Sequence, residues 1–70
     1  MPIVIAPLDV ELTIVKVLTD EKTKKHLESL GIFANGKIKI ISVNNGNVIC
    51  IAKGVRLGLN SEIARKILVA

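Results

Sequence analysis

The chain has 70 residues, half of them hydrophobic, and carries a formal net charge of +4 at pH 7. A chain of this length has no room for separate cofactor-binding and substrate-binding halves, so we expect residues 1–70 to form a single domain. Phe33 is the only aromatic residue, which excludes an aromatic ligand cage or a base-stacking platform. The charge excess suits an acidic protein, a nucleic acid or an anionic membrane surface, but it also serves to keep a small aliphatic domain in solution.

The first eight residues are apolar, but prolines interrupt them and no basic residues precede them. Such a stretch is too short to span a bilayer and is a poor signal peptide, so we expect a first strand or an ordered arm. The single cysteine, Cys50, cannot form an intrachain disulfide, which fits a reducing compartment such as the cytoplasm.

A strand and a helix are predicted next. Residues 11–18 are rich in β-branched and apolar side chains and predict a strand. Thr19 stands before Asp20-Glu21, an arrangement typical of a helix N-cap, because a hydroxyl can accept a backbone hydrogen bond and carboxylates favour the positive helix end. We expect this helix to run to about Leu30 and to end at Gly31, which can adopt the left-handed C′ conformation.

Asn45-Gly46 lies between two apolar runs, 37–43 and 48–53, and predicts a hairpin with a type I′ turn. A regular ladder from this turn pairs Val43 with Val48 and separates the side chains into two faces. We assign one face to the core: Ile38, Ile40, Ile49 and Ile51. The opposite face is apolar near the turn and basic away from it, and we expect it to be only partly covered: Lys37, Lys39, Ile41, Val43, Val48 and Cys50.

The last part of the chain predicts two further strands. Gly54 indicates a bulge or sharp bend into a strand over 55–59, with Leu57 and Leu59 pointing inward. Asn60 begins a single capped helical turn, and residues 67–69 form a closing strand. The order is therefore strand, helix, three strands, helical turn and strand. It predicts a mainly β fold, a small five-stranded barrel with one or two short helices.

Several features of the chain, taken in order, resemble the FeoA family, small cytoplasmic proteins associated with bacterial ferrous iron uptake. They are the helix end Leu27-Glu28-Ser29-Leu30-Gly31-Ile32, Gly36 before a strand, the run Gly54-Val55-Arg56-Leu57-Gly58-Leu59, and the closing Glu62 to Val69. The resemblance implies an SH3-like barrel and an accessory role beside the FeoB-type membrane transporter, through binding to its cytosolic portion. Domains of this type also end metal-dependent repressors, so the resemblance implies binding of Fe²⁺ or another divalent transition metal.

The residues themselves offer little to a metal or a reaction. The candidate metal ligands are His26 and Cys50, but no good ligand stands three or four residues from His26 in the helix. Cys50 lies among aliphatic residues, where cysteine usually behaves as a small buried hydrophobe. Nothing in the pattern brings the two together as a nucleophile and base. We therefore expect no certain cofactor, no small-molecule substrate and no enzymatic activity.

Protein binding is the function that the pattern favours. The candidate contact residues are Lys37, Lys39, Ile41, Val43, Val48 and Arg56. Two alternatives stay open: the arm Ile3-Val4-Ile5 covers this face, or the uncovered apolar face supports weak self-association. A different function, a basic nucleic-acid-binding module or a regulatory domain like those of metal-dependent repressors, would use lysines on the helix and strands. The lack of stacking aromatics disfavours nucleic acid as the partner.

Overall fold

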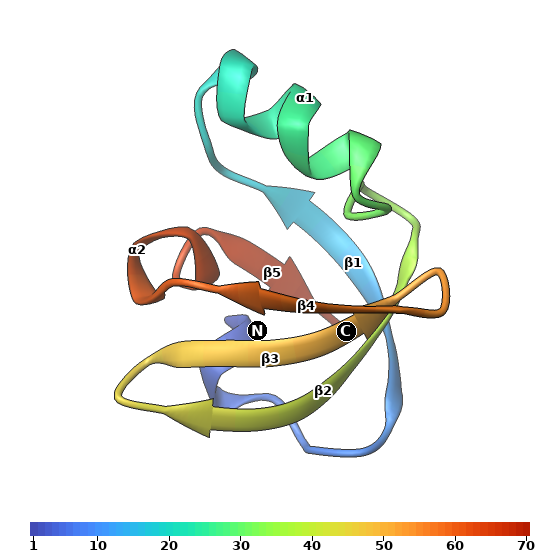
Figure 1. Cartoon of the computed structure of the whole chain (residues 1–70), viewed down its shortest axis with the longest axis vertical. Helices are drawn as coiled ribbons and strands as arrows, with labels where there is room; N and C mark the ends of the chain where they lie inside the picture. Colours follow the sequence, from blue (N-terminus) through green and yellow to red (C-terminus); the bar gives the residue numbers. More distant parts are fainter.

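The computed structural model describes all residues 1–70, and its β-strands form one five-stranded sheet in the order β4-β3-β2-β1-β5. The elements in chain order are η1 (Ile3–Ile5), β1 (Glu11–Val17), α1 (Glu21–Ser29), β2 (Lys37–Asn44), β3 (Asn47–Ala52), β4 (Val55–Leu59), α2 (Ser61–Ala64) and β5 (Ile67–Val69). All neighbouring strands are antiparallel. In Figure 1 the sheet curves around the centre of the molecule, and α1 stands at one end beside β1. The predicted mainly β architecture with two short helices is confirmed.

Residues with positive φ form the predicted turns. Asn45 (φ 54) and Gly46 (φ 81) connect β2 to β3, as a type I′ turn requires. Lys53 (φ 52) and Gly54 (φ 75) connect β3 to β4 in the same two-residue manner, which confirms the sharp bend expected at Gly54. Gly31 (φ 96) follows α1 and ends it. Local turn chemistry thus determines where three of the elements, β2, β3 and α1, end.

The two α-helices differ in how their first turns are capped. Asp20, and not the predicted Thr19, occupies the N-cap position of α1, and the Thr19 hydroxyl is buried without a hydrogen-bond partner. In α2 the side chain of Asn60 accepts a hydrogen bond from the Ile63 amide at 2.9 Å, as the capping pattern predicts. A second amide, that of Ser61, donates to Asn47 Oδ1 at 2.9 Å, so α2 is tied to the start of β3.

The N-terminal residues form an ordered arm rather than a strand. Met1 exchanges hydrogen bonds with Val69, and Pro2 forms an isolated bridge with Leu68, so the arm runs along the free edge of β5. Ile3 is fully buried in the core. The arm therefore covers an edge that would otherwise expose unpaired backbone groups.

The core is a single aliphatic cluster without any buried charged side chain. Its members are Ile3, Ala6, Leu12, Ile14, Val17, Leu27, Ile32, Ile38, Ile40, Val48, Cys50, Ala52, Leu59, Ala64, Ile67 and Val69. Leu27 is the only buried residue of α1, which is consistent with a helix that covers one end of a sheet. No helix of the structure is both long and apolar enough to cross a membrane.

The predicted hairpin register is correct only near the turn. Val43 pairs with Val48 and Ser42 with Ile49, but Ile40 then pairs with Cys50, which leaves Ile41 as an extra residue in a β-bulge. A bulge opposes two residues of one strand to one of the other, so it reverses the inside-outside pattern beyond it.

The bulge corrects the predicted core face. Ile38 and Ile40 are buried as expected, but they share the inner face with Val48, Cys50 and Ala52. Ile49 and Ile51, which were predicted to be in the core, are only partly buried. Without the bulge, Val48 and Cys50 of β3 would lie on the same side of the sheet as the lysines of β2.

A second irregularity lies in β1, where the pairing with β5 shifts between Ile14 and Lys16. Val15 is the extra residue and its side chain is exposed. Bulges bend a strand and increase its twist, so two of them help this short sheet to curve around its core.

Candidate partner-binding groove

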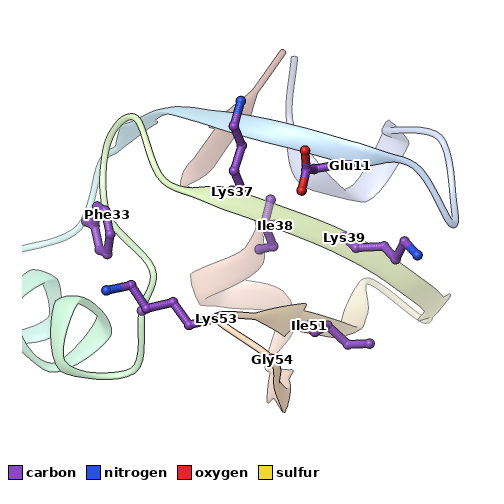
Figure 2. A pocket seen from close by; sticks show the side chains of 9 residues that line it. Glu11, Phe33, Lys37, Ile38, Lys39, Ile51, Lys53 and Gly54 are labelled. Carbon is purple, nitrogen blue, oxygen red and sulfur yellow. The ribbon is translucent and has the colours of Figure 1, made fainter.

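The outer face of the sheet is hollowed by a groove of about 470 Å³ between β1, β2, the turn after β3 and the segment that follows α1 (Figure 2). Nine residues line this groove: Glu11, Gly31, Phe33, Lys37, Ile38, Lys39, Ile51, Lys53 and Gly54. Charged and apolar groups therefore meet in one surface depression, which was not expected from any single segment of the sequence.

Strand register explains how these side chains come to one face. Glu11 lies opposite Lys39, Lys39 opposite Ile51, and Ile51 opposite Arg56, across β1, β2, β3 and β4 in turn. Residues directly opposite each other in an antiparallel pair project from the same face. The row thus places a carboxylate, an ammonium, an aliphatic side chain and a guanidinium side by side on the outer surface.

One wall of the groove is built from the Lys53-Gly54 turn and the end of α1. Lys53 Nζ lies 5.0 Å from the centroid of the Phe33 ring, a cation–π contact worth about 0.5–1 kcal/mol at an exposed position. The aliphatic stem of Lys53 passes over Gly31, where an added Cβ would stand 3.1 Å from Lys53 Cγ. Figure 2 shows Lys53 extended toward Phe33. The glycine that ends the helix therefore also makes room for this lysine.

The opposite wall carries Lys37 and Lys39 on β2. Lys37 Nζ donates a hydrogen bond to Thr13 Oγ1 at 2.8 Å, and Lys37 and Thr13 are also strand partners. This bond orients the lysine but leaves its charge in place, because a hydroxyl carries none. The lining contains three lysines and one glutamate, so the groove has a net positive charge.

The structure divides the residues that were predicted to contact a partner. Lys37, Lys39 and Arg56 are exposed on the outer face. Ile41 is partly buried at the bulge, and Val43, near the hairpin tip, is 36% exposed. The expectation that Val48 lies on the same open face is wrong, because its side chain is 0% exposed in the core. The bulge at Ile41 is the physical reason, since it places the β2 lysines and Val48 on opposite faces.

The alternative that the N-terminal arm covers the face carrying Val48 and Cys50 holds in part, because Ile3 lies in the same buried core cluster as these two residues. The arm does not cover the groove. The arm pairs with β5, and none of its residues lines the groove. Sequence reasoning missed Phe33, Ile51 and Glu11 as parts of the site. No signal in the sequence indicates the Phe33–Lys53 contact, because the two residues lie in separate loops that only the folded chain brings together.

The two candidate metal ligands do not form a site. His26 is exposed on α1, whereas Cys50 is fully buried in β3, where burial raises the pKa of its thiol to about 11. A thiol must lose its proton to bind a metal, and this environment opposes that loss. No group of three or more His, Cys, Asp or Glu side chains lies together anywhere in the structure. The residues present therefore do not fit a site for Fe²⁺ or another divalent transition metal.

Comparison with known proteins decides the family. The family model described as the FeoA domain matches residues 1–70. The chain belongs to the FeoA domain family. No curated protein matches it significantly. Among solved structures, it is similar to one described as "Crystal Structure of Iron Uptake Regulatory Protein (FeoA) Solved by Sulfur SAD in a Monoclinic Space Group". The TM-score is 0.86 at 18% sequence identity, over 99% of this chain and 93% of that one.

The likeness to this FeoA structure confirms the predicted SH3-like small barrel. At 18% identity this likeness concerns the fold alone. Membership of the FeoA family supports an accessory role in ferrous iron transport.

Proposed function

We propose that this FeoA-family protein acts in the cytoplasm, where it binds the cytosolic portion of an FeoB-type ferrous iron transporter and modulates uptake without catalysing a reaction. The groove on the outer face of the sheet is the observation that carries this proposal. It combines three lysines with Phe33 and Ile51 in a surface depression, and Arg56 extends the same row of side chains. Such a mixture of exposed charge and aliphatic surface suits a protein partner.

The remaining chemistry of the chain supports binding rather than turnover. The only thiol is buried and held protonated, and the only histidine stands exposed on a different element. A nucleophile needs a base within hydrogen-bond reach, whereas here the thiol is fully buried among aliphatic side chains and the imidazole is exposed on α1. The family is one of small accessory domains, which agrees with this reading.

The test is a titration of the full chain with the purified cytosolic portion of the transporter. Lys39→Glu and Arg56→Glu reverse the two positive charges of the outer-face row, on either side of Ile51, and both side chains are exposed, so the fold should tolerate them. Lys22→Glu on α1 introduces the same charge change away from the groove and is the matched control.

We expect Lys39→Glu and Arg56→Glu to weaken binding by about tenfold or more, since reversing an interfacial charge replaces an attraction with a repulsion. Lys22→Glu should leave the Kd nearly unchanged. If the wild-type chain does not bind the cytosolic portion at all, the proposal fails. Binding that all three variants weaken equally would show a general effect of net charge, and the groove would not be the contact surface.

A further inference from the structure

We infer that the groove holds an extended acidic segment of a protein partner, whose carboxylates contact Lys37, Lys39 and Lys53 and whose central aliphatic side chain packs on Ile51. These three lysines are called the groove lysines below. The inference rests on the proposed function, because it names the chemistry of the segment through which a partner would be recognised. It concerns this chain's own groove and does not depend on the identity of the transporter.

The charges in the groove favour an anionic occupant. Lys37 is hydrogen-bonded to a hydroxyl and Lys53 lies over an aromatic ring, so neither contact neutralises the ammonium group. Glu11 is the only acidic residue in the lining, against three lysines. Figure 2 shows Lys37, Lys39 and Lys53 on different sides of the groove, with Lys37 extending toward β1 and Lys53 toward Phe33. Carboxylates placed in the groove would meet positive charge on more than one side.

The floor of the groove favours a segment that also carries an aliphatic side chain. Ile51 is partly buried and lies between Lys39 and Arg56 in the outer-face row. Covering it would remove apolar surface from water and lower the local dielectric around the lysines, which strengthens their attraction to carboxylates. The groove volume of about 470 Å³ is within the range of about 300–1,000 Å³ that is usual for ligand pockets. It can therefore take a few side chains rather than a whole domain surface.

Two of the groove lysines are held in place before any partner arrives. The stem of Lys53 lies over Gly31 and its ammonium over Phe33, while Lys37 is held by Thr13. Side chains that are already ordered lose less conformational entropy on binding. Two of the three positive charges of the groove are thus ordered in the free protein, which favours binding of an anionic segment.

A protein segment fits these features better than a nucleic acid. One face of the single aromatic ring is already occupied by an ammonium group, and a stacking platform for successive bases needs more than one ring. Glu11 would repel a continuous phosphate backbone, whereas a peptide can present an amide to it. A peptide can also alternate carboxylates with an aliphatic side chain, which the mixed lining requires.

The probe is a capped peptide with a central Leu flanked on both sides by Glu residues, titrated into the full wild-type chain at physiological salt. The first comparison peptide replaces every Glu with Gln, and the second replaces the Leu with Ser. Single-stranded oligothymidylate of matched charge is the nucleic-acid comparison. Two triple variants of the protein test the location: one changes the groove lysines to Gln, and the control changes Lys22, Lys25 and Lys66, which are exposed elsewhere, to Gln.

We expect the Glu-Leu-Glu type peptide to bind and each groove lysine to contribute about twofold to fivefold in Kd, as exposed ion pairs do. The groove triple variant should therefore bind about tenfold to a hundredfold more weakly, whereas the control triple variant should stay within about threefold of wild type. The Gln peptide should bind much more weakly than the Glu peptide, and the Ser peptide should bind severalfold more weakly.

Three results would overturn the inference. They are no binding of the acidic peptide, equal losses in the two triple variants, and tighter binding of oligothymidylate than of the peptide. If the groove triple variant lacks a cooperative thermal transition, Lys39→Gln alone decides the outcome, because it changes one exposed side chain.

The same variants titrated with the cytosolic portion of the transporter separate the two proposals. Transporter binding that the groove variants leave intact would remove the acidic-segment inference and keep the proposed function. Peptide binding at the groove without transporter binding would keep the acidic-segment inference and remove the proposed function.

Discussion

The β-bulge at Ile41 determines which of two neighbouring residues of β3, Val48 or Ile49, contributes more to stability. A regular hairpin places Ile49 in the core and Val48 outside, whereas the observed register buries Val48 completely and leaves Ile49 partly exposed over Gly58. Replacing each in turn with threonine tests this directly, because threonine keeps a β-branched shape and a high strand propensity. The substitutions Val48→Thr and Ile49→Thr are therefore a matched pair.

The expected magnitudes follow from burial. Val48→Thr exchanges a methyl group for a hydroxyl at a fully buried position, where burial of an unpaired polar group costs about 1–3 kcal/mol. We expect a loss of about 2 kcal/mol. Ile49→Thr removes more carbon atoms, but from a partly exposed side chain, so its cost should stay below about 1 kcal/mol. At about 0.05–0.15 kcal/mol per residue, a domain of this size has roughly 4–10 kcal/mol of stability, so both variants should fold.

Urea unfolding followed by far-UV circular dichroism measures both losses. With an m-value of about 1 kcal/mol/M, a loss of 2 kcal/mol moves the midpoint by about 2 M, and the m-value should stay unchanged. Greater destabilisation by Ile49→Thr than by Val48→Thr would mean that the regular register is correct and that the bulge is absent. Equal losses would likewise contradict the observed difference in burial.

Three further predictions concern a turn, the thiol and a helix cap. Gly31→Ala should lower stability by about 1–3 kcal/mol, because φ is 96° and the new Cβ would press on the Lys53 stem at 3.1 Å. Gly54→Ala, with φ 75° but open space around it, should cost less in the same urea unfolding assay. The pKa of Cys50 rises from 9.0 to about 11 in the folded chain, so the unfolded state loses the thiol proton first. Stability should therefore fall as pH rises above about 9. The variant Cys50→Ala should lack this part of the decline, and a thiol reagent at pH 8 should modify Cys50 only at the rate of unfolding. A wild-type thiol that reacts at once in the native protein would contradict its burial. Asn60→Ala should cost about 1 kcal/mol through loss of the 2.9 Å cap on α2, measured as a shift of the urea midpoint, and an unchanged midpoint would mean that the cap contributes nothing.

The candidate site could be predicted only in part. Lys37, Lys39 and Arg56 are charged residues on strands, and the sequence correctly indicates that they face solvent. Phe33 follows α1 and Lys53 follows β3, twenty residues apart in the chain, and only the folded arrangement brings the ring and the ammonium group together. Periodicity describes one element at a time, so it cannot predict a wall made from two loops.

The amino-acid sequence by itself determines the order of the elements and the positions of most turns. Asn45-Gly46 and Gly31 adopt the positive φ values that their turn chemistry predicts, and Asn60 caps the helix that it precedes. These features depend on neighbouring residues alone, so they can be read without knowing the fold.

The tertiary structure decides which face of the hairpin is inside. Both faces of β3 are apolar, with Val48 and Cys50 on one and Ile49 and Ile51 on the other, so alternation within the strand cannot choose between them. The choice follows from packing: Ile38 and Ile40 must enter the core, while Lys37 and Lys39, which alternate with them, stay in water. One extra residue in β2 puts Ile38 and Ile40 on the same buried face as Val48 and Cys50. The bulge at Ile41 therefore places the core on one side of the sheet and the groove with its lysines on the other.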